Sequence, residues 1–124
     1  MLQHMQALGL RTLIYPTRNL DAAKRWFTQA FGVAPYFDQP FYVGFDIAGY
    51  ELGLNPGAEM TDGPVAYWGV DDPHAGVDEL VDQGATIAEA PHDVGDGIVV
   101  ATVRDPFGQL IGLIRNPHFK LSTS

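Results

Sequence analysis

The stretch DPFGQLIGL, residues 105–113, decides how this chain is interpreted. Asp105-Pro106-Phe107-Gly108 has the composition of a tight turn, and the apolar residues that follow fit a strand closing a hairpin. A similar ending occurs earlier, where residues 49–54 read GYELGL. The recurrence of this pattern indicates that one kind of hairpin is used twice.

The segments that precede the two hairpins are also related. RTLIYPTRNLDAA begins at Arg11 and VAYWGVDDPHAG begins at Val65. An offset of 53 residues (72 minus 19) aligns Asn19 with Asp72, and an offset of 59 (108 minus 49) aligns the hairpins. We therefore expect two tandem β-α-β-β-β units within one domain spanning residues 1–124, unit one at about 8–56 and unit two at about 64–117.

Local signals place the expected elements. Asn19, and Asp72 or Asp71, are suitable helix caps, while Gly32 and Gly84 are suitable helix ends. In the first unit we expect strands at 8–15, 41–47 and 51–54 and a helix at 20–31; in the second, strands at 65–70, 97–104 and 109–115 and a helix from 72 to about 83. The fold class is α+β, with a curved mixed sheet around a cleft and the helices on its outer face.

Alternation along a strand sorts its side chains onto two faces. If Ala48-Gly49 is a two-residue turn, Gly44 lies opposite Gly53 and Asp46 lies opposite Glu51. The cleft face then carries Tyr42, Gly44, Asp46, Glu51, Gly53 and Asn55 in the first unit, Val99, Ala101, Val103, Leu110, Gly112 and Ile114 in the second, and Thr12, Ile14, Val65 and Tyr67 from the opening strands. We expect the rings of Tyr15, Trp26 and Trp68 in the core. Glycine at 53 and 112 indicates either space for a guest or a close packing contact.

Composition excludes several classes of function. With 15 acidic and 7 basic residues, the net charge of −8 argues against nucleic-acid binding. No apolar window is long enough to span a bilayer and no signal peptide is recognisable, so we expect a cytoplasmic protein without a membrane partner. The chain has no cysteine, and its two serines, Ser122 and Ser124, stand in the last three residues. Thiolate ligands and serine-hydrolase chemistry are therefore not expected.

Three segments, NLDAAKRWFTQAFGV, VDDPHAGVDELVDQGA and DPFGQLIGL, resemble the glyoxalase, bleomycin-resistance and extradiol-dioxygenase superfamily, also called vicinal oxygen chelate proteins. In its metal-using members, a His or Gln opens each unit and a Glu stands on each closing strand. Carried over, those positions fall on Thr12, Gly53, Val65 and Gly112, none of which is a convincing metal ligand. A shift of two residues would bring Glu51 into the first glutamate position. The resemblance also implies a homodimer.

Two functions follow from these residues. The first is a metal-free protein that sequesters or senses an aromatic or cationic small molecule, with ligand-binding candidates Thr12, Ile14, Tyr42, Asp46, Glu51, Gly53, Asn55, Tyr67 and Gly112. The alternative is a glyoxalase-like lyase or isomerase, or a dioxygenase, with an atypical site for a divalent metal such as Zn, Ni or Mn. Its catalytic candidates are Glu51 and His92, the latter expected in a loop that folds over the cleft.

Overall fold

A computed structural model describes residues 5–121, so Ser122 and Ser124 lie outside the described part. The element order is β1 (Gly9–Pro16), α1 (Leu20–Phe31), β2 (Phe37–Gln39), β3 (Tyr42–Ile47), β4 (Tyr50–Asn55), the short 3-10 helix η1 (Met60–Asp62), β5 (Val65–Gly69), α2 (Pro73–Asp82), β6 (Thr86–Gly95), β7 (Ile98–Arg104) and β8 (Leu110–Arg115). The expected α+β class and the repeated β-α-β-β-β order are confirmed. Within residues 5–121, no helix is long and apolar enough to cross a membrane.

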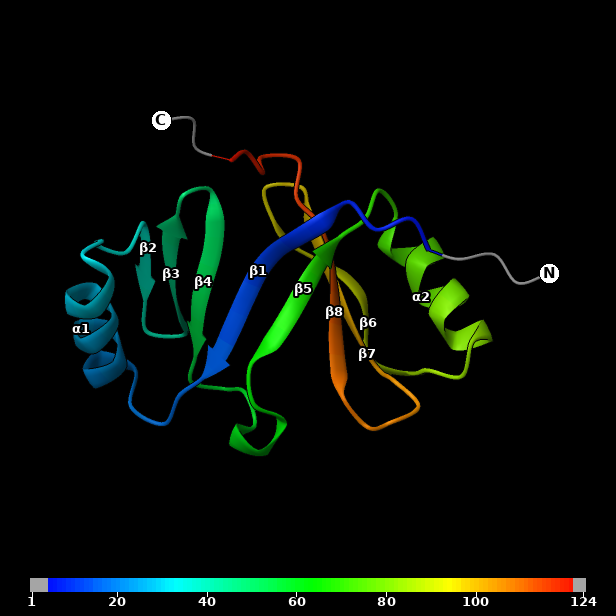
Figure 1. The fold of residues 1–124 in the computed structure, drawn as a ribbon, viewed down its shortest axis with the longest axis horizontal. Coiled ribbons are helices and arrows are strands. Elements are labelled where there is room, and N and C mark those ends of the chain that lie inside the picture. Colours follow the sequence, from blue (N-terminus) through cyan, green and yellow to red (C-terminus); the bar gives the residue numbers. More distant parts are fainter. Residues whose placement is uncertain (1–4, 122–124) are drawn as a thin grey trace. The chain divides into compact units, whose positions relative to one another are not determined.

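The chain forms two compact units, drawn in Figure 1. Of the described residues, the first unit contains Thr12–Val65 and residues 119–121, and the second contains residues 5–11 and Ala66–His118. The strand order is β2-β3-β4-β1 in the first unit and β5-β8-β7-β6 in the second. Each unit is mixed, because β1 pairs with β4 and β5 with β8 in parallel, while the hairpin strands pair antiparallel.

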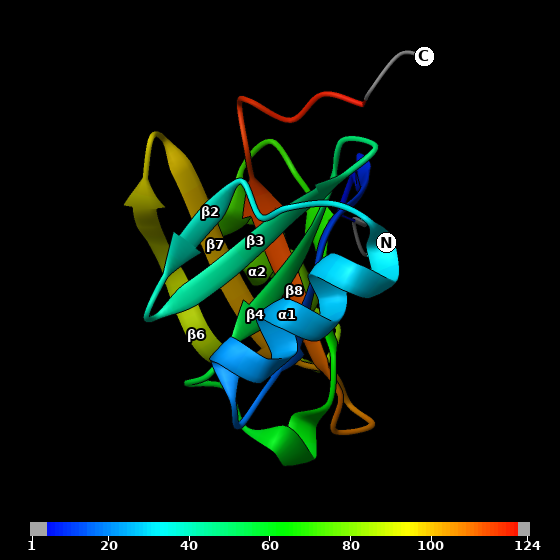
Figure 2. The ribbon, with the colours of Figure 1, turned by 90° about the vertical axis from the view of Figure 1, so that its left-hand side faces the viewer.

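Helix α1 covers one face of the first unit, as Figure 2 shows. The Asn19 side chain caps the helix by accepting a hydrogen bond from the Ala22 amide at 3.0 Å, and Gly32 ends it with φ of 68°. Its apolar stripe packs on the buried side chains of β3 and β4. Trp26 is 61% exposed, so its expected place in the core is wrong. The narrow stripe of Leu20, Ala23 and Phe27 already covers the sheet, and Trp26 contacts the edge of the Phe27 ring instead.

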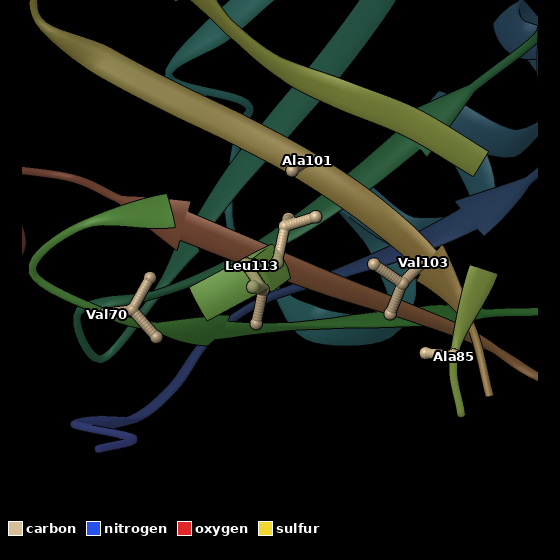
Figure 3. Close-up of a cluster of buried hydrophobic side chains, with 6 residues drawn as sticks. Val70, Ala85, Ala101, Val103 and Leu113 are labelled. Atoms are coloured by element: carbon tan, nitrogen blue, oxygen red, sulfur yellow. The ribbon is translucent and has the colours of Figure 1, made fainter. Parts of the chain in front are cut away.

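Helix α2 covers one face of the second unit. The Asp72 side chain accepts hydrogen bonds from the amides of His74 and Ala75, and Pro73 occupies the first turn. Val77 of α2 belongs to the buried cluster shown in part in Figure 3, together with Val70, Ala85, Ala101, Val103 and Leu113. Trp68 pairs with Leu113 but remains 39% exposed, so its predicted burial is also wrong.

The second hairpin differs from its expected register by one residue. Thr102 pairs with Gly112 and Ala101 with Leu113, so Ala101 and Val103 face α2 rather than accompanying Gly112. The connection has five residues, because the Asp105 amide donates to the Gln109 carbonyl at 2.8 Å and the Asp105 carboxylate accepts from the Phe107 and Gln109 amides. A single residue of slip exchanges the two faces of a strand. The Gly112 face therefore carries Val100, Thr102 and Arg104 in place of Val99, Ala101 and Val103.

Candidate functional site

Glu51 is the centre of a hydrogen-bonded cluster in the first unit. It stands on β4, where Leu52 and Leu54 face α1. Because side chains alternate along a strand, the Glu51 side chain lies on the opposite face of the sheet. Thr12, paired with it on β1, donates from Oγ1 to Glu51 Oε1 at 3.2 Å, and the Tyr42 hydroxyl donates to the same oxygen at 3.0 Å. The Tyr36 hydroxyl donates to Oε2. Three hydroxyl groups thus fix the carboxylate.

Two glycines of the sheet lie directly beneath the side chains of this cluster. Gly44 and Gly53 are direct cross-strand partners, as the two-residue turn predicted. A Cβ at Gly53 would lie 1.9 Å from the Tyr42 hydroxyl oxygen, and one at Gly44 would lie 2.8 Å from Glu51 Oε2. The space above Gly53 is therefore filled by Tyr42. Of the two alternatives for this glycine, the structure supports the close packing contact.

Within the described residues of the first unit, the charge of Glu51 has no cationic partner, and its hydrogen-bond donors there are all neutral hydroxyls. Burial raises the pKa of Tyr36 above its usual range, and the nearby carboxylates of Glu51 and Asp46 raise it further. Tyr36 therefore remains a protonated donor at neutral pH. The arrangement presents an oriented negative charge surrounded by hydroxyl groups.

An aromatic group adjoins the carboxylate cluster. Phe37 pairs with Gly44, which places it on the Glu51 face, and its ring centroid lies 6.2 Å from that of Tyr42 and 5.9 Å from that of Phe41. Phe41 is 66% exposed and Tyr36 is 63% exposed. Exposed rings beside a carboxylate offer faces on which a flat or cationic molecule can stack.

The other first-unit candidates have different surroundings. Ile14 pairs with Gly53 on the same face of the sheet. Asp46 lies opposite Glu51 as expected, but its Oδ1 accepts a hydrogen bond from the Gly49 amide at 2.8 Å. Asn55 likewise accepts from the Gly57 amide at 2.8 Å. Asp46 and Asn55 thus stabilise turns at the two ends of β4.

The second-unit candidates Tyr67 and Gly112 form a packed pair. They are cross-strand partners, and a Cβ at Gly112 would lie 2.4 Å from Tyr67 Cδ2. Burial, together with the nearby Glu89 carboxylate, raises the pKa of Tyr67 to about 12. Among the residues that the structure describes, none accepts a hydrogen bond from the Tyr67 hydroxyl.

His92 belongs to strand β6 and not to a loop, so that expectation is wrong. It pairs with Val100, its Nδ1 lies 2.8 Å from the Ala90 carbonyl oxygen, and its Nε2 lies 3.7 Å from Glu89 Oε2. Register shifts interrupt β6 between Glu89 and His92. Such irregularities hide the alternation by which a strand is recognised in a sequence. His92 therefore lies in the second unit, whereas Glu51 lies in the first.

The residues present do not fit the divalent metal that the superfamily implies. In the described part of the chain, no group of three or more His, Cys, Asp or Glu side chains gathers as a metal site would require. The groups that bond to Glu51 are hydroxyls, and the one other carboxylate beside it in the first unit is that of its cross-strand partner Asp46. Neither Zn, Ni nor Mn would find adequate ligands at this cluster.

Two residues near the candidate site residues, Tyr36 beside Glu51 and Glu89 near Tyr67, were not predicted from the sequence. Tyr36 precedes the three-residue strand β2, which is too short to show a period, and its amide bonds to the Gly44 carbonyl at 3.0 Å. Glu89 lies in the interrupted strand β6. The only available signal for Tyr36 was its position among the aromatic residues 36, 37, 41 and 42.

Comparison with known proteins agrees with this architecture. The model of the glyoxalase/bleomycin resistance protein/dioxygenase superfamily matches residues 4–113. No curated protein matches the chain.

Solved structures share the fold at low identity. A methylmalonyl-CoA epimerase in complex with methylmalonyl-CoA and NH4+ aligns with a TM-score of 0.74 at 16% identity, covering 95% of this chain and 100% of the other. The Mycobacterium tuberculosis methylmalonyl-CoA epimerase gives 0.72 at 18%, covering 94% of each chain. A superfamily member from Vibrio splendidus gives 0.66 at 17%, covering 86% and 97%. With the family match over most of its length, the chain belongs to the glyoxalase/bleomycin resistance protein/dioxygenase superfamily.

Proposed function

We propose that this chain is a small-molecule-binding protein that sequesters or senses an aromatic or cationic compound without a resident metal. The ligand would lie on the Glu51 face of the first unit. The observation that carries this proposal is the fixed, uncompensated carboxylate of Glu51, which three neutral hydroxyls orient. A half-buried anion without a counter-ion favours a guest that supplies positive charge.

Catalysis by Glu51 is less well supported than binding. Three hydroxyls already donate to the Glu51 carboxylate, two to Oε1 and one to Oε2, which leaves about one acceptor position for a substrate proton. The metal on which the alternative lyase or dioxygenase would depend has no suitable ligand group among the described residues. These observations favour an electrostatic anchor over a proton-transfer residue.

The epimerases of similar fold suggest one other ligand class. One of them is bound to methylmalonyl-CoA, an anionic thioester. The excess of acidic residues in this chain and the lack of a cation beside Glu51 favour a ligand of the opposite charge. The resemblance to the family further supports a homodimer, which light scattering after gel filtration would test.

Thermal shift with a small compound set tests the proposal. The set contains aromatic cations, neutral aromatics and aromatic acids of equal size, together with a CoA thioester. We expect cations to raise the Tm of the natural chain and to lose this effect in Glu51→Gln. Asp38→Asn is the matched control, because Asp38 pairs with Lys24 at 3.0 Å and Asp38 lies on the other face of the sheet.

Two results would contradict the proposal. One is stabilisation by acids or the thioester alone. The other is about one equivalent of tightly held metal per chain, measured by elemental mass spectrometry after dialysis against zinc, nickel and manganese and lost in Glu51→Gln.

A further inference from the structure

The acceptor positions of Glu51 are unevenly occupied. A carboxylate offers about four lone-pair positions, two on each oxygen. Thr12 and Tyr42 both donate to Oε1 through partly buried hydrogen bonds, while Tyr36 alone donates to Oε2 through an exposed one. One acceptor position therefore remains on Oε2, on the exposed side of the cluster.

The open acceptor position on Glu51 Oε2 points in one direction. It therefore favours a ligand that can direct a hydrogen-bond donor at it. An ammonium, amidinium or guanidinium group with an N–H can place a charge-assisted hydrogen bond there. A quaternary ammonium carries the same charge but has no proton to donate. Charge alone would not separate these two kinds of cation, whereas a hydrogen bond to Oε2 would.

The aromatic group supplies the remainder of the binding surface. The Phe37 ring contacts those of both Phe41 and Tyr42, and Tyr42 links this group to the carboxylate by its hydrogen bond. Ring faces attract both flat substituents and cations. A ligand that combines a protonated nitrogen with a planar ring would use both features at once.

We infer that the first unit selects protonated N–H cations bearing an aromatic ring over quaternary ammonium ions of the same size. This inference rests on the proposed function and specifies its ligand class. The N–H bonds Glu51 Oε2 and the ring lies against Phe37 and Phe41. The glycine pair Gly44 and Gly53 maintains this geometry, since a Cβ at either position would displace the carboxylate or Tyr42.

Titration calorimetry of the full chain with four benzyl probes tests the inference. The probes are benzylammonium, benzyltrimethylammonium, benzyl alcohol and benzoate, which share one ring and differ in charge and donors. We expect benzylammonium to bind about tenfold more tightly than the quaternary ion, because a charge-assisted bond is worth roughly one such factor. Glu51→Gln should reduce this ratio to about threefold or less, and Asp38→Asn should leave it unchanged.

A second variant protects the test against a folding failure of Glu51→Gln. Tyr36→Phe removes the donor on Oε2 and opens a further acceptor position there. The preference for benzylammonium should then increase, and an unchanged or reversed ratio would overturn the inference.

The remaining outcomes separate the inference from the proposed function. Equal affinity for the two cations, or tighter binding of benzyl alcohol, would overturn the N–H selection and leave small-molecule binding intact. Tightest binding of benzoate, or no binding of any probe, would overturn both.

Discussion

Each unit packs a tyrosine over a glycine of its sheet, but the two tyrosines have different partners. In the first unit the Tyr42 hydroxyl covers Gly53 and donates to Glu51. In the second, the Tyr67 ring covers Gly112. Glu51 stands two residues before its glycine, whereas Leu110 stands two residues before Gly112. The repeat thus preserves the packing arrangement, while among the described residues only the tyrosine of the first unit donates a hydrogen bond to a carboxylate.

The difference separates a packing arrangement that both units share from the hydrogen-bonded carboxylate on which the proposed function rests. A Gly–Tyr pair fills space in both units and does not by itself indicate a binding site. The hydroxyl-bound carboxylate is specific to the first unit, so we place the binding chemistry there. Variants that act on one unit and leave the other intact test this assignment.

The largest expected effect is on stability, from Gly112→Ala. The new Cβ would meet Tyr67 Cγ at 2.5 Å and Cδ2 at 2.4 Å, at the base of a partly buried ring, where rotation of the side chain relieves the clash least. Overpacking of this kind costs about 1–3 kcal/mol, measurable as a loss in the free energy of unfolding in urea. Gly53→Ala should cost less, because it meets the far end of Tyr42, which can rotate away.

The comparison would fail if the two alanine variants were equally destabilised. Gly57→Ala is a suitable control, since its nearest neighbour would be Asn55 Oδ1 at 3.4 Å. Gly53→Ala should instead abolish the preference for cations, because Tyr42 no longer orients Glu51.

Alkaline pH should destabilise the chain through the partly buried Tyr67. The pKa of Tyr67 is about 12 in the folded chain against 10.0 ordinarily, so the unfolded chain loses this proton first. The corresponding stability is complete below pH 10 and is lost as pH rises from 10 to 12. Urea unfolding across this window should show the fall, and Tyr67→Phe should show a smaller one. An identical pH dependence in Tyr67→Phe would contradict the assignment.

Removing each tyrosine hydroxyl sharpens the comparison between the units. Tyr42→Phe deletes a donor to a half-buried carboxylate, and we expect a loss of about 1 kcal/mol in the free energy of unfolding. Tyr67→Phe deletes a hydroxyl that bonds to no other described residue, so it should stay within about 0.5 kcal/mol of the natural chain at pH 7. Equal losses of unfolding free energy in both variants would show that the hydrogen bond from Tyr42 to Glu51 does not add to stability.

The smallest expected effect concerns the two-residue turns that join β3 to β4 and β6 to β7. Ala48 and Gly49 have positive φ in the first unit, as do Asp96 and Gly97 in the second. Aspartate and asparagine tolerate this conformation better than alanine. Ala48→Asn should therefore raise the free energy of unfolding by about 0.5 kcal/mol, and Asp96→Ala should lower it by a similar amount. Thermal melts of the two variants should shift in opposite directions.

The turns also explain how far the fold could be predicted. Ala48-Gly49 fits the commonest hairpin connection, so the register of the first hairpin, including the Gly44–Gly53 and Asp46–Glu51 pairs, was correct. In the second hairpin, Asp105 organises a five-residue connection through two side-chain hydrogen bonds. Sequence composition identifies such a turn but not its length, and the length determines which face each side chain takes.

The candidate site was predictable where side chains sit on regular strands. Thr12, Tyr42, Glu51 and Gly53 were all placed on the Glu51 face by alternation and are brought together. Tyr36 was missed because it lies outside any period. Trp26 was misplaced because an apolar residue beside a helical stripe gives no information on how wide the covered surface is.

The third hydroxyl of the cluster comes from a weakly anchored part of the first unit. Tyr36 immediately precedes β2, a three-residue strand that pairs with β3 alone. Short edge strands open readily, and each opening of β2 would withdraw the Tyr36 hydroxyl from Glu51. Amide hydrogen exchange in residues 36–39 therefore reports how often the carboxylate exchanges its protein donor for solvent. Each opening of this edge would free the second acceptor position of Oε2 as well.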